Sequence, residues 1–141
     1  MNARARGGVV ILACGLSAAA GAADFDGSTP LVCASMEVFE CDAGGAGCRT
    51  VTADSIAAPR FLKLDLRRGE ITSSRNGIAE KMPTPQHAGG RLVLQGVIGE
   101  ERPDNAGLAW SLAIDETNGN MVLSASGEDA AFVIFGACTV I

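Results

Sequence analysis

The side chain best suited to proton transfer near neutral pH occurs once in this chain, as His87. It lies within residues 83–90, a stretch with Pro and Gly that predicts a solvated loop and not a rigid setting for a general base. The sequence contains neither a Gly-x-Ser-x-Gly nucleophile elbow nor a Gly-x4-Gly-Lys-Ser/Thr phosphate loop. A small hydrolase is therefore only a second, disfavoured alternative for the function.

Adjacent carboxylates could act as a general acid and base, and three such pairs occur: Glu100–Glu101, Asp115–Glu116 and Glu128–Asp129. All three fall in stretches that we expect to be turns, where acidic residues usually serve solubility. A glycosidase needs two carboxyl groups fixed on opposite sides of a sugar. Sugar clefts also normally use aromatic platforms, and this chain has one Trp and no Tyr. We therefore expect a protein without enzymatic activity and without a cofactor.

Residues 1–23 have the pattern of a signal peptide, with Arg4 and Arg6 before an uncharged apolar run and small residues at the end. The run is short compared with the ~20 residues that span a bilayer, so we expect cleavage and no membrane segment afterwards. Residues 11–14 resemble a lipobox, which leaves a lipoprotein anchored through Cys14 as the less favoured alternative. The expected location is periplasmic or secreted.

The remaining segment, residues 24–141, is acidic. It carries 9 Lys and Arg against 16 Asp and Glu, a net charge of −7. Nucleic acids and anionic membrane surfaces are bound by concentrated Lys and Arg. The charge therefore argues against both as partners.

Four cysteines remain after the expected cleavage: Cys33, Cys41, Cys48 and Cys138. An even number in an exported chain favours disulfides, and three pairings are possible. The glycine-rich segment between Cys41 and Cys48 can fold back to join them, which leaves Cys33 for Cys138, and we prefer this pairing. A metal site or redox site is disfavoured because the chain has neither a Cys-x2-Cys spacing nor a supporting histidine.

Short apolar stretches broken by Gly, Asn, Asp and Pro at intervals of about ten residues predict an antiparallel, mainly all-β fold. Apolar side chains, most of them alternating with polar ones, mark expected strands at residues 61–66, 91–98, 110–115, 121–125 and 131–140. Asn118-Gly119 is the strongest hairpin signal. Residues 31–41 can form a strand, with Met36 and Val38 on one face, or else one short helix.

About seven to eight strands joined mostly by short turns predict a single domain over residues 24–141, an antiparallel meander or a small closed β-barrel. Residues 132–135 are apolar on both faces, so the last strand should be central or covered on both sides. A barrel of this size is filled by side chains or holds one small ligand. The inward-facing Trp110, Leu112 and Leu123 would then form the wall against that ligand.

Two segments are distinctive: residues 30–33 leading to Cys41 and Cys48, and residues 109–115 leading through Asn118-Gly119 to Cys138. They resemble a group of small exported bacterial β proteins of unknown function, a likeness that implies no activity. The size, the export signal and the cysteines near both ends are similar, more weakly, to the periplasmic inhibitors of c-type lysozyme. Such inhibitors are small β-barrels that insert a loop into the lysozyme cleft, and residues 74–81 are the nearest candidate for that loop.

We expect a non-enzymatic exported binding protein for a small apolar ligand or a protein partner. The alternative is a c-type lysozyme inhibitor, since an acidic protein suits a basic target. A pocket lined by Trp110, Leu112 and Leu123 would favour a small ligand. A packed interior with an ordered protruding loop within residues 74–90 would favour inhibition.

Overall fold

The computed structural model describes residues 25–45, 47–98 and 107–141. The expected signal peptide, Cys14 and the Glu100–Glu101 pair therefore lie outside the described residues. No helix in the described part of the chain is long and apolar enough to cross a membrane. The strands are β1 (Leu31–Asp42), β2 (Gly47–Val51), β3 (Phe61–Asp65), β4 (Glu70–Ser73), β5 (Ala79–Lys81), β6 (Gln86–Ala88), β7 (Arg91–Ile98), β8 (Leu108–Asp115), β9 (Asn120–Ser126) and β10 (Ala130–Val140).

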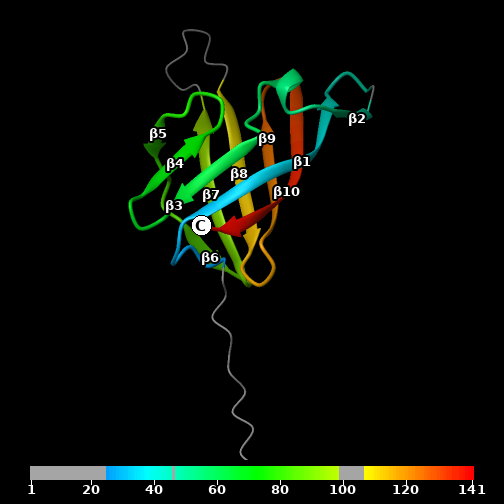
Figure 1. The fold of residues 1–141 in the computed structure, drawn as a ribbon. Helices are drawn as coiled ribbons and strands as arrows, with labels where there is room; N and C mark the ends of the chain where they lie inside the picture. Colours follow the sequence, from blue (N-terminus) through cyan, green and yellow to red (C-terminus); the bar gives the residue numbers. More distant parts are fainter. Residues whose placement is uncertain (1–24, 46, 99–106) are drawn as a thin grey trace, which may run out of the picture.

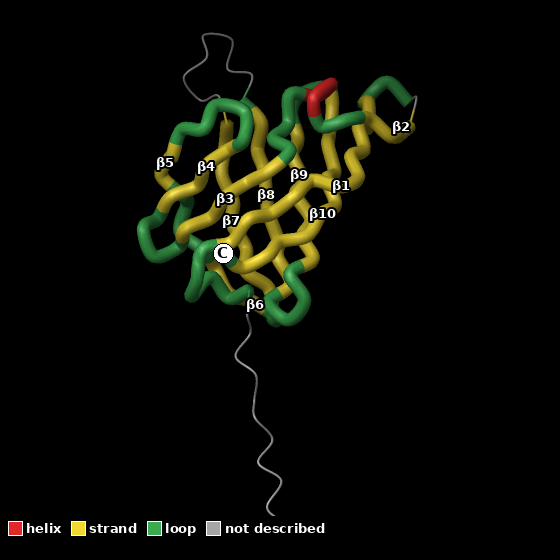
Figure 2. The backbone as a smooth tube through the Cα atoms, viewed as in Figure 1, coloured by secondary structure: helices red, strands yellow, loops and turns green. Residues whose placement is uncertain are grey.

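These strands form one antiparallel sheet in the order β5-β4-β3-β1-β10-β9-β8-β7-β6, with β2 paired to the second half of β1. Figure 1 shows β3, β1 and β10 crossing in front of β7, β8 and β9, so the sheet curls into a half-barrel whose inner faces oppose each other. The end at which β10 finishes is called the lower end below. The helical structure in the described residues is one 3-10 turn, Asp54–Ile56, at the opposite, upper end (Figure 2). The predicted all-β antiparallel meander is confirmed.

β5 and β6, the strands at the two edges of the sheet, come from one continuous segment of the chain, residues 79–88. β4 and β7 run upward, and β5 and β6 pair antiparallel with them, so residues 79–88 descend throughout. Pairing with β4 extends to Met82, whose N–H donates to the carbonyl oxygen of Gly69 at 2.8 Å. Pro83 and Pro85 follow and have no N–H to donate, and β6 then pairs with β7. If β5 and β6 are counted as one strand, the curled sheet without β2 has eight strands, the upper end of the predicted seven to eight.

The inner face is a packed aliphatic core. Alternation along the strands turns every second residue inward, and the fully buried aliphatic side chains at 0% exposure are Leu31, Leu64, Leu92, Leu112 and Ile114. Burying one such side chain stabilises a fold by about 1.5–3 kcal/mol. The core joins the front strands β1 and β3 to the back strands β7 and β8.

Both disulfides have the pairing expected from the sequence, Cys33–Cys138 and Cys41–Cys48. Cys33 and Cys138 are direct partners in the register of β1 and β10. Cys41 and Cys48 are direct partners in the register of β1 and β2. One bridge therefore ties the first strand to the last, and the other closes a local hairpin.

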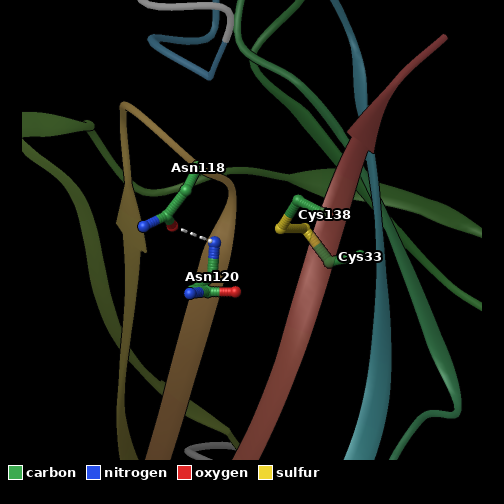
Figure 3. Close-up of a disulfide and its surroundings, with 4 residues drawn as sticks. All are labelled: Cys33, Asn118, Asn120 and Cys138. Atoms are coloured by element: carbon green, nitrogen blue, oxygen red, sulfur yellow. Dashed lines mark hydrogen bonds between the residues drawn. A yellow bond between two sulfur atoms is a disulfide. The ribbon is translucent and has the colours of Figure 1, made fainter.

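The turn between β8 and β9 lies beside the first of these bridges (Figure 3) and contacts the backbone of Cys138. Asn118 accepts the N–H of Asn120 on its Oδ1 at 2.9 Å, and Gly119 has a φ of +74°. The carbonyl oxygen of Gly119 accepts the N–H of Cys138 at 2.8 Å. A Cβ added at Gly119 would lie 2.8 Å from the carbonyl oxygen of Cys138 and 2.6 Å from the ring of Phe25. The predicted Asn-Gly hairpin is therefore present, and its glycine is needed for packing as well as for the turn.

A β-bulge after Ser35 changes which residues of β1 face inward. Met36 is 72% exposed whereas Val38 is buried, so the prediction that the two share a face was wrong, because the bulge adds a residue that simple alternation does not count. Opposite the bulge, a Cβ at Gly136 would lie 2.0 Å from the carbonyl oxygen of Ala34. The close approach of β1 and β10 therefore requires glycine at this position.

Candidate functional site

His87 lies in β6 and not in a loop, which corrects the sequence prediction. Pairing of β6 with β7 places it opposite Leu92, and its half-exposed side chain puts Nδ1 2.5 Å from Oε1 of Glu116. Glu116 follows β8 and is fixed by its N–H, which donates to the carbonyl oxygen of Gly90 at 3.0 Å. The loop prediction was wrong because residues 86–88 have no alternating pattern of their own and form a strand by pairing with β7.

An open depression of about 590 Å³ surrounds this pair at the lower end, and its lining is Asp26, Gly27, Ser28, Leu66, Arg67, Pro85, His87 and Glu116. Asp26 accepts the backbone N–H of Ser28 at 2.7 Å. That bond, followed by the Ser28 hydroxyl, holds the pKa of Asp26 below its usual value. The depression thus has a partly apolar lining, with Leu66 and Pro85, and groups of both charges, with the carboxylates of Asp26 and Glu116 beside Arg67 and His87.

This arrangement holds only part of the machinery of an acid–base catalyst. A carboxylate on Nδ1 orients the imidazole, as in many catalytic sites. Within the described ranges, however, no Ser or Thr hydroxyl bonds to His87, and Ser28 bonds to Asp26. Across residues 25–45, 47–98 and 107–141, no group of three or more His, Cys, Asp or Glu side chains is placed to hold a metal ion.

A second ion pair at the same end involves Asp115, the last residue of β8. Its Oδ2 accepts Nη1 of Arg91 across the β7–β8 ladder at 2.5 Å, and its Oδ1 accepts the hydroxyl and N–H of Thr117. The Thr117 bonds, and then Arg91, lower the pKa of Asp115. Asp115 and Glu116, which we expected to be turn residues serving solubility, each hold a partner distant in sequence.

The three residues expected to line a ligand wall lie on the inner face at different depths. Leu112 is completely buried in the core. Trp110 is partly buried over Gly96, where an added Cβ would come within 2.9 Å of the indole. Leu123 is also partly buried and packs against the core from β9. The middle of the predicted wall is therefore occupied by close packing.

The turn between β4 and β5 is an exposed hairpin tip. Residues 74–81 are exposed throughout, and Ile78 is 61% exposed. The N–H of Gly77 donates to the carbonyl oxygen of Ser73 at 2.9 Å, and the N–H of Ile78 donates to Oδ1 of Asn76 at 3.1 Å. These bonds hold the tip in one shape. Of the loop expected within residues 74–90, residues 74–78 form this tip, and parts of the rest are β5 and β6.

The outward positions of β8, β9 and β10 are uncharged over residues 109–113, 122–126 and 131–137, whereas Asp115 ends β8 on this side and Glu37 of β1 pairs with Phe135. We define the uncharged outer face as the outward positions in these three ranges together with Phe39 of β1. Its members are Phe39, Ala109, Ser111, Ala113, Val122, Ser124, Ser126, Ala131, Val133, Phe135 and Ala137. Phe135 is 44% exposed and makes an edge-to-face contact with Phe39 at a centroid distance of 6.0 Å. Exposed antiparallel sheet faces normally alternate apolar-in with polar-out, so this face departs from the ordinary pattern.

β10 is central in the sheet, as the apolar side chains on both faces of residues 132–135 predicted. That prediction did not cover the neighbouring strands β8 and β9. The signal was present, because every second residue from Ala109 to Ala113 and from Val122 to Ser126 is small or apolar.

Comparisons with family models, curated proteins and solved structures find no match for this chain.

Proposed function

We propose that this chain is a non-enzymatic, exported binding protein whose partner is another protein. The observation that carries the proposal is the contrast between Leu112, which has no exposed surface in the middle of the wall, and the ordered, exposed tip at residues 74–78. A small apolar ligand needs an open apolar cavity, whereas a preorganised projecting loop suits a protein surface. The protein partner is therefore favoured over the small ligand.

Export is supported by the two disulfides, which persist in oxidising compartments such as the periplasm or the extracellular space. The proposal of a non-enzymatic role is supported by the setting of His87, which lies in an open depression and bonds to no Ser or Thr hydroxyl of the described residues. Replacing His87 with Ala should leave partner binding unchanged. A loss of function in H87A as large as that in Ile78→Asp, a variant of the hairpin tip, would contradict the non-enzymatic proposal.

The test uses the protein purified from its own cell envelope and analysed by native mass spectrometry. We expect a protein to co-purify and its retention to fall in Ile78→Asp, because a charge at the exposed tip opposes apolar contact. Phe135→Asp, which also places a charge at an exposed apolar position, is the control and should retain the partner. Retention of a small molecule in place of a protein, or equal retention in both variants, would overturn the proposal.

Inhibition of a c-type lysozyme is the second candidate, favoured by the same hairpin tip together with the net charge of −7 in residues 24–141. Lysozymes of this class are basic, so the charges are complementary. The assay measures the clearing of a bacterial cell-wall suspension by a c-type lysozyme with and without this protein. Inhibition that is lost in I78D supports the candidate, and undiminished clearing at about a tenfold molar excess removes it.

A further inference from the structure

We propose that the Cys41–Cys48 bridge is a site of thiol–disulfide exchange with an external dithiol, and that its opening releases β2 from β1. The two bridges of this chain differ in their access to solvent. Cys33 and Cys138 are 0% and 8% exposed and belong to the core. Cys48 is exposed, and Cys41 is partly exposed. Because a thiolate must reach a sulfur atom to attack it, the Cys41–Cys48 bridge is the one that can react in the folded protein.

The position of each bridge along β1 explains this difference. Cys33 lies two residues after Leu31, and both are buried on the inner face. The β-bulge in β1 then shifts the alternation, so that Val38 is the next buried residue and Cys41 has the outward parity of Phe39. The first bridge is therefore buried inside the half-barrel, whereas the second lies on its outer side.

The bridge is also the main constraint on β2. In the described part of the chain, β2 pairs with residues 38–42 of β1 and with no other strand, and Figure 1 shows it at the margin of the fold. Residues 47–50 are exposed, and Val51 packs against the core. The ion pair between Arg49 and Glu40 joins the same two strands, but its Arg side chain is largely exposed, and such pairs contribute little. An isolated two-stranded hairpin is only marginally stable, so β2 depends on its disulfide.

The reaction consists of two exchanges that balance. A thiolate of the dithiol attacks Sγ of Cys48, the more exposed cysteine, and forms a mixed disulfide while Cys41 leaves as a thiolate. The second thiol of the reagent, as its thiolate, then attacks the reagent sulfur of the mixed disulfide and expels the thiolate of Cys48. The two protein thiolates take up the protons that the dithiol has lost, so the bridge gains two electrons and the dithiol is oxidised by two. A Cys-x2-Cys pair is not needed, because the bridge is the substrate of this exchange and not its catalyst.

Opening the bridge frees a short loop, since the two cysteines are separated by 7 residues in sequence. The loop-entropy relation then predicts that the local opening equilibrium of β2 rises roughly fiftyfold. Val51 separates from its register partner Val38, and residues 38–42 of β1 lose their ladder partners on this side. The core strands and the Cys33–Cys138 bridge stay in place.

The first test treats the folded, oxidised protein with dithiothreitol at neutral pH without denaturant and alkylates the free thiols after increasing times. Peptide mapping should show alkylated Cys41 and Cys48 at least about a hundredfold sooner than Cys33 and Cys138, because a buried bridge reacts only when the fold opens. Brief treatment with reduced glutathione should place the adduct on Cys48. Equal rates for the two bridges, earlier reduction of Cys33–Cys138, or no reduction of either would overturn the proposal.

Hydrogen exchange read by mass spectrometry tests the release of β2. In the selectively reduced protein, and in the variant with Cys41→Ala and Cys48→Ala, peptides covering residues 47–51 should exchange roughly fiftyfold faster than in the oxidised protein, and β8 and β9 should not change. Glu40→Gln, which removes the ion pair but keeps the bridge, is the matched control and should change the exchange of β2 far less. Unchanged exchange of β2 after the bridge has opened would overturn the proposal. Neither test involves the hairpin tip at residues 74–78, so this proposal and the proposed function fail separately.

Discussion

Removing the Cys33–Cys138 bridge should destabilise the fold about twice as much as removing the Cys41–Cys48 bridge. A disulfide acts mainly by restricting the unfolded chain, and the restriction grows with the length of the closed loop. The sequence separations are 105 and 7 residues. The loop-entropy relation then gives about 4.8 kcal/mol for the long loop and about 2.4 kcal/mol for the short one at 25 °C.

The assay compares two double variants, Cys33→Ala with Cys138→Ala, and Cys41→Ala with Cys48→Ala. With an unfolding entropy of about 2.1 cal/mol/K per residue over residues 25–141, these losses lower the thermal midpoint by about 20 °C and about 10 °C. Circular dichroism melts under oxidising conditions measure both values. The short-loop variant is the control for the loss of any disulfide.

Equal shifts in the two variants, or a larger shift for the Cys41–Cys48 variant, would refute this reasoning. Peptide mapping without reduction checks the premise. A peptide joining Cys33 to Cys41 would show that the loop lengths used here are wrong.

Three further predictions concern the turn, the core and the charges. Gly119→Ala should lower the unfolding free energy in urea titrations by about 2–4 kcal/mol, since it combines a positive φ with a clash against the Cys138 carbonyl. Gly77→Ala, where φ is +66° and the space is open, should lower it by only about 1 kcal/mol. Equal losses would contradict the packing role of Gly119. Leu112→Ala should cost about 2–5 kcal/mol because it empties a closed core position, and Leu123→Ala should cost less, so the reverse order would reveal room around Leu112. The pKa of Asp115 is lowered by folding, so its contribution to stability is present above the unfolded pKa of about 3.9 and is lost as pH falls through the lower folded pKa. Asp115→Asn should therefore flatten the decline of the melting temperature below about pH 4. An unchanged decline would contradict the lowered pKa of Asp115.

Local patterns in the sequence were sufficient for much of the fold. The alternation of Leu62 and Leu64, that of Trp110, Leu112 and Ile114, and the Asn118-Gly119 turn each specify an element without reference to the rest of the chain. The disulfide pairing also followed from local geometry, because the segment between Cys41 and Cys48 is short and rich in glycine.

The remaining features depend on contacts between distant segments. The division of residues 79–88 between β4 and β7 has no local signal other than Pro83 and Pro85, and the His87–Glu116 pair joins residues 29 apart. The bulge at Met36 is set by the register with β10 and not by the pattern of β1 itself. The uncharged outer face could have been found from the sequence, but only once the strands on either side of β10 were known.

The position of β10 also governs when this protein can become folded. β10 follows the other described strands in the chain, yet it pairs along β1 from Leu31 to Asp42 and supplies the thiol that Cys33 needs. A chain that is synthesised from its N-terminus therefore has no partner for this side of β1 until residues 130–140 have been made. Contacts between residues so distant in sequence form slowly, so the chain stays unfolded during most of its synthesis. A stop codon just before residue 130 would consequently yield an unfolded chain and not a half-barrel that lacks one strand.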